Sequence, residues 1–154
     1  RSRPRRLMIV WRICRAAHAD LLGEGARLYG GRWNTPGHAM IYTAEAAALA
    51  VLEVRVHLDL TPDLLPDDYL LIGIETGDTP PEIVPTIPDD PASFGDDWLA
   101  TRRSALLRVP SVIVPESANL LINPRHPGAE TLRIVSRRPF RFDDRLWRPL
   151  SFHQ

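Results

Sequence analysis

The stretch 44–58, AEAAALAVLEVRVHL, constrains the fold of this chain more than any other segment. Its apolar residues recur almost all the way round a helix, and such a helix is buried on most sides rather than lying on the surface. Thr43 is the candidate N-cap, and Glu45 lies near the positive end of the predicted helix. The rest of the 154-residue chain must cover this helix, which predicts one core and a single domain.

Short apolar, β-branched segments are predicted to form strands around that helix. They are residues 7–13, 39–43, 69–75, 111–114 and 131–135, and a second, amphipathic helix is predicted over 96–107. The order of these elements is not a βαβ alternation, so we expect an α+β fold with short strands. Residues 1–6 are expected to be a disordered or artificial tail before a domain that spans 7–154.

Glycine and proline mark the irregular segments. Residues 21–37 contain five glycines and are predicted to be too broken for regular structure. Prolines spaced through 80–91 predict a stiff surface excursion with neither helix nor sheet. Residues 119–127, NLLINPRHP, are predicted to be a shaped loop, and 139–146 close the domain. Long loops carry function disproportionately, so these segments are the first candidates for a functional site.

Charge and cysteine content exclude several function classes. Nineteen basic residues, all of them Arg, balance nineteen acidic ones, so nucleic acid is not expected as a direct partner. The single Cys14 excludes a disulfide framework and a Cys-based zinc site, and the five His form no HxH or HExxH pattern, so no metal is expected. No apolar run approaches the roughly 20 residues that span a bilayer. We therefore expect a cytoplasmic protein that does not contact a membrane.

Glu53 is anomalous on the predicted central helix, because Leu49 and Ala50 precede it by one turn and His57 follows by one turn. A carboxylate among apolar neighbours is paired, hydrogen-bonded or functional, since burying an unpaired charge is costly. The alternatives are a functional role and an ion pair or water-facing position. His57 is interpreted as a core histidine, with a supporting role beside Glu53 as the alternative.

Residues 29–37, YGGRWNTPG, combine two adjacent glycines with an Arg and a Trp. Glycine lets backbone amides approach a ligand closely, the Arg32 guanidinium is a planar fork suited to phosphate, and Trp33 offers a stacking face. An ordinary turn explains the same pattern. The segment matches neither the P-loop nor the GxGxxG fingerprint.

Residues 109–127, VPSVIVPESANLLINPRHP, gather hydrogen-bonding side chains among prolines that fix the backbone. Rigid loops of this composition suit a polar ligand. The alternative is that Asn and Pro only shape turns. The side chains are those of Ser111, Ser117, Asn119, Asn123, Arg125 and His126.

These motifs in this order, followed by PFRFDDRLW, resemble the RES domain, the toxin half of bacterial RES–Xre toxin–antitoxin systems. The resemblance covers the chain from about residue 7 to residue 147. It implies a fold like that of the ADP-ribosyltransferase toxins, a split, strongly bent pair of small sheets with flanking helices and with NAD+ in the cleft. It also implies a reaction that breaks the nicotinamide glycosidic bond, with NAD+ as the substrate and no metal.

The resemblance assigns roles to particular residues. Glu53 would stabilise positive charge at the ribose, Arg32 would hold the pyrophosphate, and Tyr42 would stack on nicotinamide. Ser111 would hydrogen-bond the ribose or Glu53, and Ser117 is its rival for the family's Ser. The implied catalytic residues are Glu53, Arg32, Tyr42 and Ser111, and the implied NAD+-binding residues are Tyr29, Gly31, Arg32, Trp33, Tyr42, Ser111 and Asn123.

The function implied by the resemblance is that of a toxin acting as an NAD+ glycohydrolase or an ADP-ribosyltransferase. The acceptor stays open between water, phosphate and a side chain of a target protein. The alternative is an NAD-binding interaction module without turnover. The implied partner is an Xre-type helix-turn-helix antitoxin, in a complex of paired toxin and antitoxin chains. Asp89, Asp90, Asp96 and Asp97 mark one place where a target protein would dock.

Overall fold

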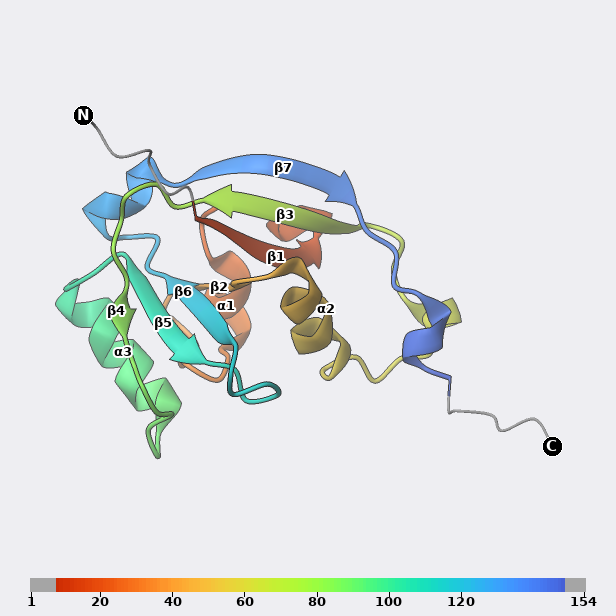
Figure 1. The fold of residues 1–154 in the computed structure, drawn as a ribbon, viewed down its shortest axis with the longest axis horizontal. Helices are drawn as coiled ribbons and strands as arrows, with labels where there is room; N and C mark the ends of the chain where they lie inside the picture. Colours follow the sequence, from red (N-terminus) through yellow and green to blue (C-terminus); the bar gives the residue numbers. More distant parts are fainter. Residues whose placement is uncertain (1–7, 149–154) are drawn as a thin grey trace.

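Within residues 8–148, which the computed structural model describes, seven strands form one hydrogen-bonded sheet (Figure 1). The strands are β1 (Ile9–Arg15), β2 (Ile41–Ala44), β3 (Tyr69–Glu75), β4 (Glu82–Ile83), β5 (Leu106–Pro110), β6 (Ala118–Ile122) and β7 (Arg133–Pro139). The helices are α1 (Glu24–Tyr29), α2 (Ala47–Arg55) and α3 (Pro91–Thr101), with 3-10 turns at Ala16–His18, Pro62–Leu64, Pro127–Thr131 and Asp144–Leu146. The expected α+β class is confirmed. The tail expected at 1–6 lies outside the described residues.

The sheet is divided into two halves. Its strand order is β4-β5-β6-β2-β1-β3-β7, and neighbours are antiparallel except for β4 and β5. β1 pairs with β3 along its whole length, whereas β1 and β2 share only the pair Trp11↔Ala44. We call β4-β5-β6-β2 and β1-β3-β7 the two half-sheets. Their strands run in different directions in Figure 1, so the expected pair of small sheets is present, continuous at one residue pair.

Three apolar clusters hold these elements together. The first lies between the half-sheets and includes Val10 from one and Leu120 from the other. The second lies against α3, where Trp98 packs near Leu121. The third lies against α2 and includes Leu49. Leu120 and Leu121 belong to different clusters because successive side chains of a strand point to opposite faces.

Helix α2 is shorter and less buried than the sequence predicts. It begins at Ala47, and Thr43 is not its cap: Thr43 lies in β2, where its hydroxyl donates to the carbonyl of Leu120 at 2.7 Å. On α2 only Leu49 and Ala50 are buried, and Leu52 is 38% exposed. The prediction of a helix buried on most sides is therefore wrong, because the sheet covers only one of its faces.

Two predicted elements are displaced along the chain. The helix predicted over 96–107 is α3, which has Pro91 in its first turn and ends where Arg102 adopts a left-handed backbone, with φ of 51°. Residues 106–110 then form β5, and residues 111–114, predicted as a strand, lie in turns and irregular structure. β6 occupies part of the segment predicted as the loop 119–127.

Two further elements, α1 and β4, lie within the glycine-rich and proline-rich segments that were predicted to lack regular structure. α1 interrupts the glycine-rich segment, bracketed by Gly23 and Gly30 and spanned by the ion pair of Arg27 with Glu24. β4 lies inside the proline-rich segment and pairs with β5. The predicted strand at 69–75 has the bounds of β3, whereas β1, β2 and β7 each begin two residues later than predicted.

Candidate active site

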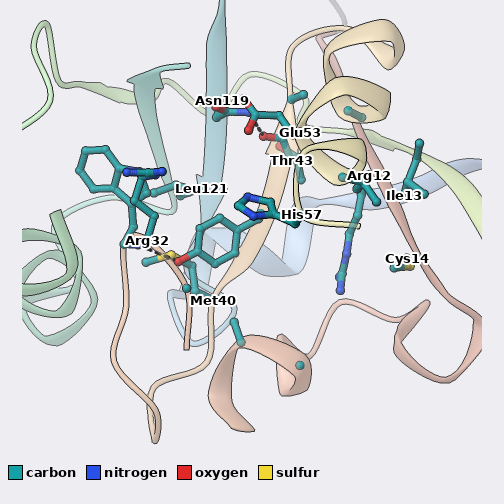
Figure 2. A pocket seen from close by; sticks show the side chains of 18 of the residues that line it. Arg12, Ile13, Cys14, Arg32, Met40, Thr43, Glu53, His57, Asn119 and Leu121 are labelled. Atoms are coloured by element: carbon teal, nitrogen blue, oxygen red, sulfur yellow. Dashed lines mark hydrogen bonds between the residues drawn. The ribbon is translucent and has the colours of Figure 1, made fainter. Parts of the chain in front are cut away.

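A cavity of about 910 Å³ opens where β1 and β2 separate, within the usual size range of small-molecule sites. Its walls come from both half-sheets, from α2, from the chain after α1 and from the start of α3. Figure 2 shows its polar side chains, with Arg32 and Arg12 at opposite sides and Glu53 between them. The labelled polar residues are Arg12, Arg32, Thr43, Glu53, His57 and Asn119.

The carboxylate of Glu53 reaches the cavity from α2 and is held by Ser111. The Ser111 hydroxyl donates to Glu53 Oε1 at 2.7 Å and accepts from the amides of Ile113 and Val114, both at 3.1 Å. A serine hydroxyl has one proton and two acceptor positions, so these contacts use its full capacity. Ser111 is fully buried and orients Glu53. The serine in contact with Glu53 is thus Ser111 and not Ser117.

Arg32 projects from a tight turn formed by residues 31–34, which we call the Arg32 turn. The Gly31 amide donates to the carbonyl of Asn34 at 3.0 Å, and this bond closes the turn. The side-chain amide of Asn34 donates to the carbonyls of Ala26 at 2.9 Å and His38 at 3.0 Å. Asn34 is 1% exposed, so a residue not singled out in the sequence fixes the turn from inside.

Tyr42 holds the Arg32 turn through its hydroxyl. The hydroxyl donates to Asn34 Oδ1 at 2.6 Å and accepts from the Trp33 amide at 2.9 Å. A Cβ on Gly31 would lie 2.5 Å from the same oxygen, so a larger residue would displace the Tyr42 hydroxyl from its two hydrogen bonds. Burial raises the pKa of Tyr42, and Asp96 raises it further. The ring of Tyr42 lines the cavity, while its hydroxyl is committed to the protein.

Four residues expected to bind a ligand are placed otherwise, namely the buried Ser111 described above and the three that follow. Tyr29 is 80% exposed on α1 and is not part of the cavity wall. Asn123 is buried away from the cavity, where its side chain donates to the Leu99 carbonyl and accepts from the Arg125 amide. Trp33 touches the cavity but is 3% exposed and packs edge-on against Phe94, so it has no free face for stacking.

A model of the RES domain matches residues 9–143 of the chain. The chain belongs to the RES domain family. Three curated relatives match this chain over nearly the whole of their own lengths. A Sphingobium sp. (strain YBL2) protein named Prs ADP-ribosylating toxin is 42% identical over 156 residues, with 90% of this chain and 96% of the relative covered. Proteins named Toxin Res are 40% identical in Yersinia enterocolitica (90% and 99% covered) and 38% identical in Pseudomonas putida (82% and 92% covered).

Among solved structures, the RES domain resembles a chain in the crystal structure of the M. tuberculosis MbcT–MbcA toxin–antitoxin complex. The TM-score is 0.71 at 22% identity, and the match covers 89% of this chain and 86% of the other. The likeness supports the fold described above.

Arg12 is a charged residue in the cavity wall of this RES domain that sequence reasoning missed. It lies on β1, is half-buried, and makes one long hydrogen bond, from Nη1 to the carbonyl of Asp20 at 3.5 Å. A lone charge inside the apolar run LMIVWRI was the available signal, because a charged side chain in a covered strand needs a partner.

His57 and Asn119 also line the cavity. His57 is exposed, so its interpretation as a core histidine is wrong. Asn119 lies on β6, and its side chain donates to the Thr43 carbonyl at 3.3 Å. The sequence predicts a loop at this position, but Asn119 is part of β6.

Burial raises the pKa of the Cys14 thiol, which also faces the cavity. Within residues 8–148 no three His, Cys, Asp or Glu side chains gather as a metal-binding group. In the same part of the chain no helix is both long and apolar enough to span a bilayer.

Proposed function

We propose that this RES domain is the toxin of a toxin–antitoxin pair and that it cleaves the nicotinamide–ribose bond of NAD+. The ADP-ribose would pass either to water or phosphate, as in an NAD+ glycohydrolase, or to a target protein, as in an ADP-ribosyltransferase. The relatives named above, one of them an ADP-ribosylating toxin, support this class of activity.

The contact of Glu53 with Ser111 is the observation that carries the proposal. Loss of nicotinamide leaves positive charge on C1′ and the ring oxygen of the ribose, as in glycoside hydrolysis. A carboxylate already fixed beside that charge lowers the barrier electrostatically. The Ser111 hydroxyl donates to Glu53, so it fixes the carboxylate without neutralising it.

The two guanidinium groups supply the matching charge for a dinucleotide. Arg32 and Arg12 lie at opposite sides of the cavity in Figure 2, and guanidinium groups are suited to phosphate oxygens. We assign the pyrophosphate to Arg32, with Arg12 as a second cation that the sequence did not suggest. Gly31 stays in the proposed set as a wall residue beside Arg32. Tyr29, Trp33 and Asn123 leave the proposed binding set, and so does Ser111, which keeps the role of orienting Glu53.

Tyr42 contributes its ring to this proposal and not its hydroxyl. The hydroxyl is already engaged by Trp33 and Asn34. The ring lines the cavity and would stack on nicotinamide, keeping water from the leaving group.

The partner in this proposal is an antitoxin of the Xre type, in a complex of paired toxin and antitoxin chains. The similar fold found in a toxin–antitoxin complex supports a partner of this general kind. Contact with DNA would fall to the antitoxin, because nineteen basic and nineteen acidic residues leave this chain without net charge.

The deciding experiment follows nicotinamide release from NAD+ by the purified protein. Glu53→Gln keeps the shape of the side chain and an oxygen for Ser111 but removes the charge, so we expect release to fall about 100-fold or more. Glu130→Gln, at an exposed position of a 3-10 turn that is not part of the cavity wall, is the matched control and should retain wild-type release.

Mass spectrometry of the products with phosphate or cell lysate present would identify the acceptor. NAD+ binding without release by the wild type would mean a binding module, and undiminished release by Glu53→Gln would exclude the assigned role. Expression of wild type, but not of Glu53→Gln, should arrest growth.

A further inference from the structure

We propose that Asp96 of α3 is a positioning residue for Arg32, which it serves by clamping the Arg32 turn to the side of the cavity. The inference rests on the proposed function, in which Arg32 holds the pyrophosphate. It gives Asp96 an internal role, although the sequence grouped it with the acidic residues of a docking surface.

Both oxygens of the Asp96 carboxylate are engaged by one residue at the end of the turn. Oδ1 accepts from the Thr35 amide at 3.0 Å, and Oδ2 accepts from the Thr35 hydroxyl at 2.7 Å. The two residues are 61 positions apart in the sequence. Two charge-assisted hydrogen bonds to one residue fix an orientation as well as a distance.

The two residues that precede Asp96 on α3 also pack against the Arg32 turn. Gly95 lies so close to the Trp33 carbonyl that a Cβ would overlap it, and Phe94 packs edge-on against the Trp33 ring, with centroids 6.1 Å apart. Three consecutive residues of α3 therefore contact the residues on either side of Asn34. Tyr42 holds the turn from β2, so the turn is fixed from two elements.

Arg32 depends on this support because nothing else directs it. Within residues 8–148 its guanidinium has no hydrogen-bond or ion-pair partner, so its direction is set by the backbone of the turn. Burial raises the pKa of the Tyr42 hydroxyl, and the charge of Asp96 raises it further while that of Arg32 lowers it. If the turn were more mobile, the Arg32 guanidinium would sample many positions. Pyrophosphate binding would then weaken, because the side chain would have to be ordered on binding.

The test is a double-mutant cycle on nicotinamide release with Asp96→Ala, Arg32→Ala and the double variant. We expect Asp96→Ala to raise KM about tenfold, the equivalent of one lost charge-assisted hydrogen bond, with a smaller effect on kcat. The double variant should be no worse than Arg32→Ala alone, because Asp96 acts through Arg32. If the loss of activity in the double variant equals the product of the losses in Asp96→Ala and Arg32→Ala, the two residues act independently and the proposal is overturned.

Two matched variants separate positioning from general damage. Thr35→Val removes the hydroxyl donor and should resemble Asp96→Ala, whereas Thr35→Ser keeps both donors and should restore wild-type KM. Asp97→Asn alters the neighbouring carboxylate, which is exposed and pairs with Arg103 instead, and should leave KM unchanged. If Asp96→Ala does not fold, Thr35→Val completes the same cycle. A Thr35→Val protein with wild-type KM would contradict the clamp.

Hydrogen exchange without NAD+ distinguishes failure of the clamp from failure of the proposed function. The Thr35 amide donates to Asp96. In Asp96→Ala, amide hydrogens at residues 31–36 should therefore exchange faster than in the wild type, while exchange in β5 and β6 should not change. Unchanged exchange at 31–36 overturns the clamp whatever the activity. Faster exchange in a protein whose wild type releases no nicotinamide keeps the clamp and rejects the proposed function.

Discussion

The hydroxyl of Tyr42 joins two buried partners, the Trp33 amide and the side-chain oxygen of Asn34. Removing it leaves both without their hydrogen bond in a region where Asn34 is 1% exposed. We expect Tyr42→Phe to lower the free energy of unfolding by about 1–3 kcal/mol, measured by urea denaturation. Tyr29→Phe, at an 80% exposed position, should change it by less than about 0.5 kcal/mol. Equal stabilities of the two variants would contradict the network.

The same hydroxyl predicts a loss of stability in alkaline solution. Burial raises the pKa of Tyr42 in the folded protein, while an unfolded tyrosine titrates near pH 10. Above about pH 10 the unfolded chain therefore holds fewer protons than the folded one, and the free energy of unfolding falls by up to about 1.4 kcal/mol per pH unit. Tyr42→Phe has no such proton, so its stability should fall less steeply between about pH 10 and 12. Parallel curves for wild type and variant would exclude this assignment.

Individual residues were predictable from the sequence where they broke a pattern. Glu53 stood out as a carboxylate in an apolar helix, and the cavity contains it. Arg12 breaks the apolar pattern of a strand in the same way, and that signal alone would have marked it. Asn34 broke no pattern, because its role depends on partners at Ala26, His38 and Tyr42 that only the folded chain brings together.

Helix α3 is fitted to the Arg32 turn by the absence of a side chain. Alanine favours a helix over glycine by about 1 kcal/mol, but a Cβ at Gly95 would overlap the Trp33 carbonyl. Overpacking of this kind costs about 1–3 kcal/mol, and we expect Gly95→Ala to be destabilising on balance in thermal or urea unfolding. Gly25→Ala, a helical glycine on α1 whose added Cβ would lie 3.9 Å from His18, is the control and should stabilise. A stabilised Gly95→Ala would refute the close packing of α3 on the turn.

Element boundaries were predicted poorly where tertiary contacts decided them. Thr43 has the chemistry of a cap, yet its hydroxyl bonds across the sheet to Leu120 and the helix starts four residues later. The amphipathic signal after residue 96 was real but displaced, because Asp90 caps α3 through the Ser93 amide and Arg102 ends it. Gly23 and Gly30 suggested a segment without regular structure, but they flank α1 as its N-cap and C-cap residues.

At the scale of the whole molecule, the sequence indicated the α+β class through strand-sized apolar runs that do not alternate with helices. The strand order could not be read from it. β2 lies next to β6, although 77 positions separate Thr43 from its hydrogen-bond partner Leu120. β1 lies next to β3 in the same way, with Arg15 paired to the distant Tyr69. The cavity arises from that order, because its walls come from segments that are distant in the chain.

The single pair Trp11↔Ala44 between the half-sheets also bears on how such a domain can diversify. Arg12 lies next to this junction on β1 of one half-sheet. On the other half-sheet, Tyr42 lies near it on β2, and the chain continues from β2 into α2, which carries Glu53. Few backbone hydrogen bonds would change if the angle between the halves changed. A substitution at the junction that repacks the apolar cluster shared by the two halves would therefore shift the spacing of the cationic and acidic groups, and with it the range of accepted ligands.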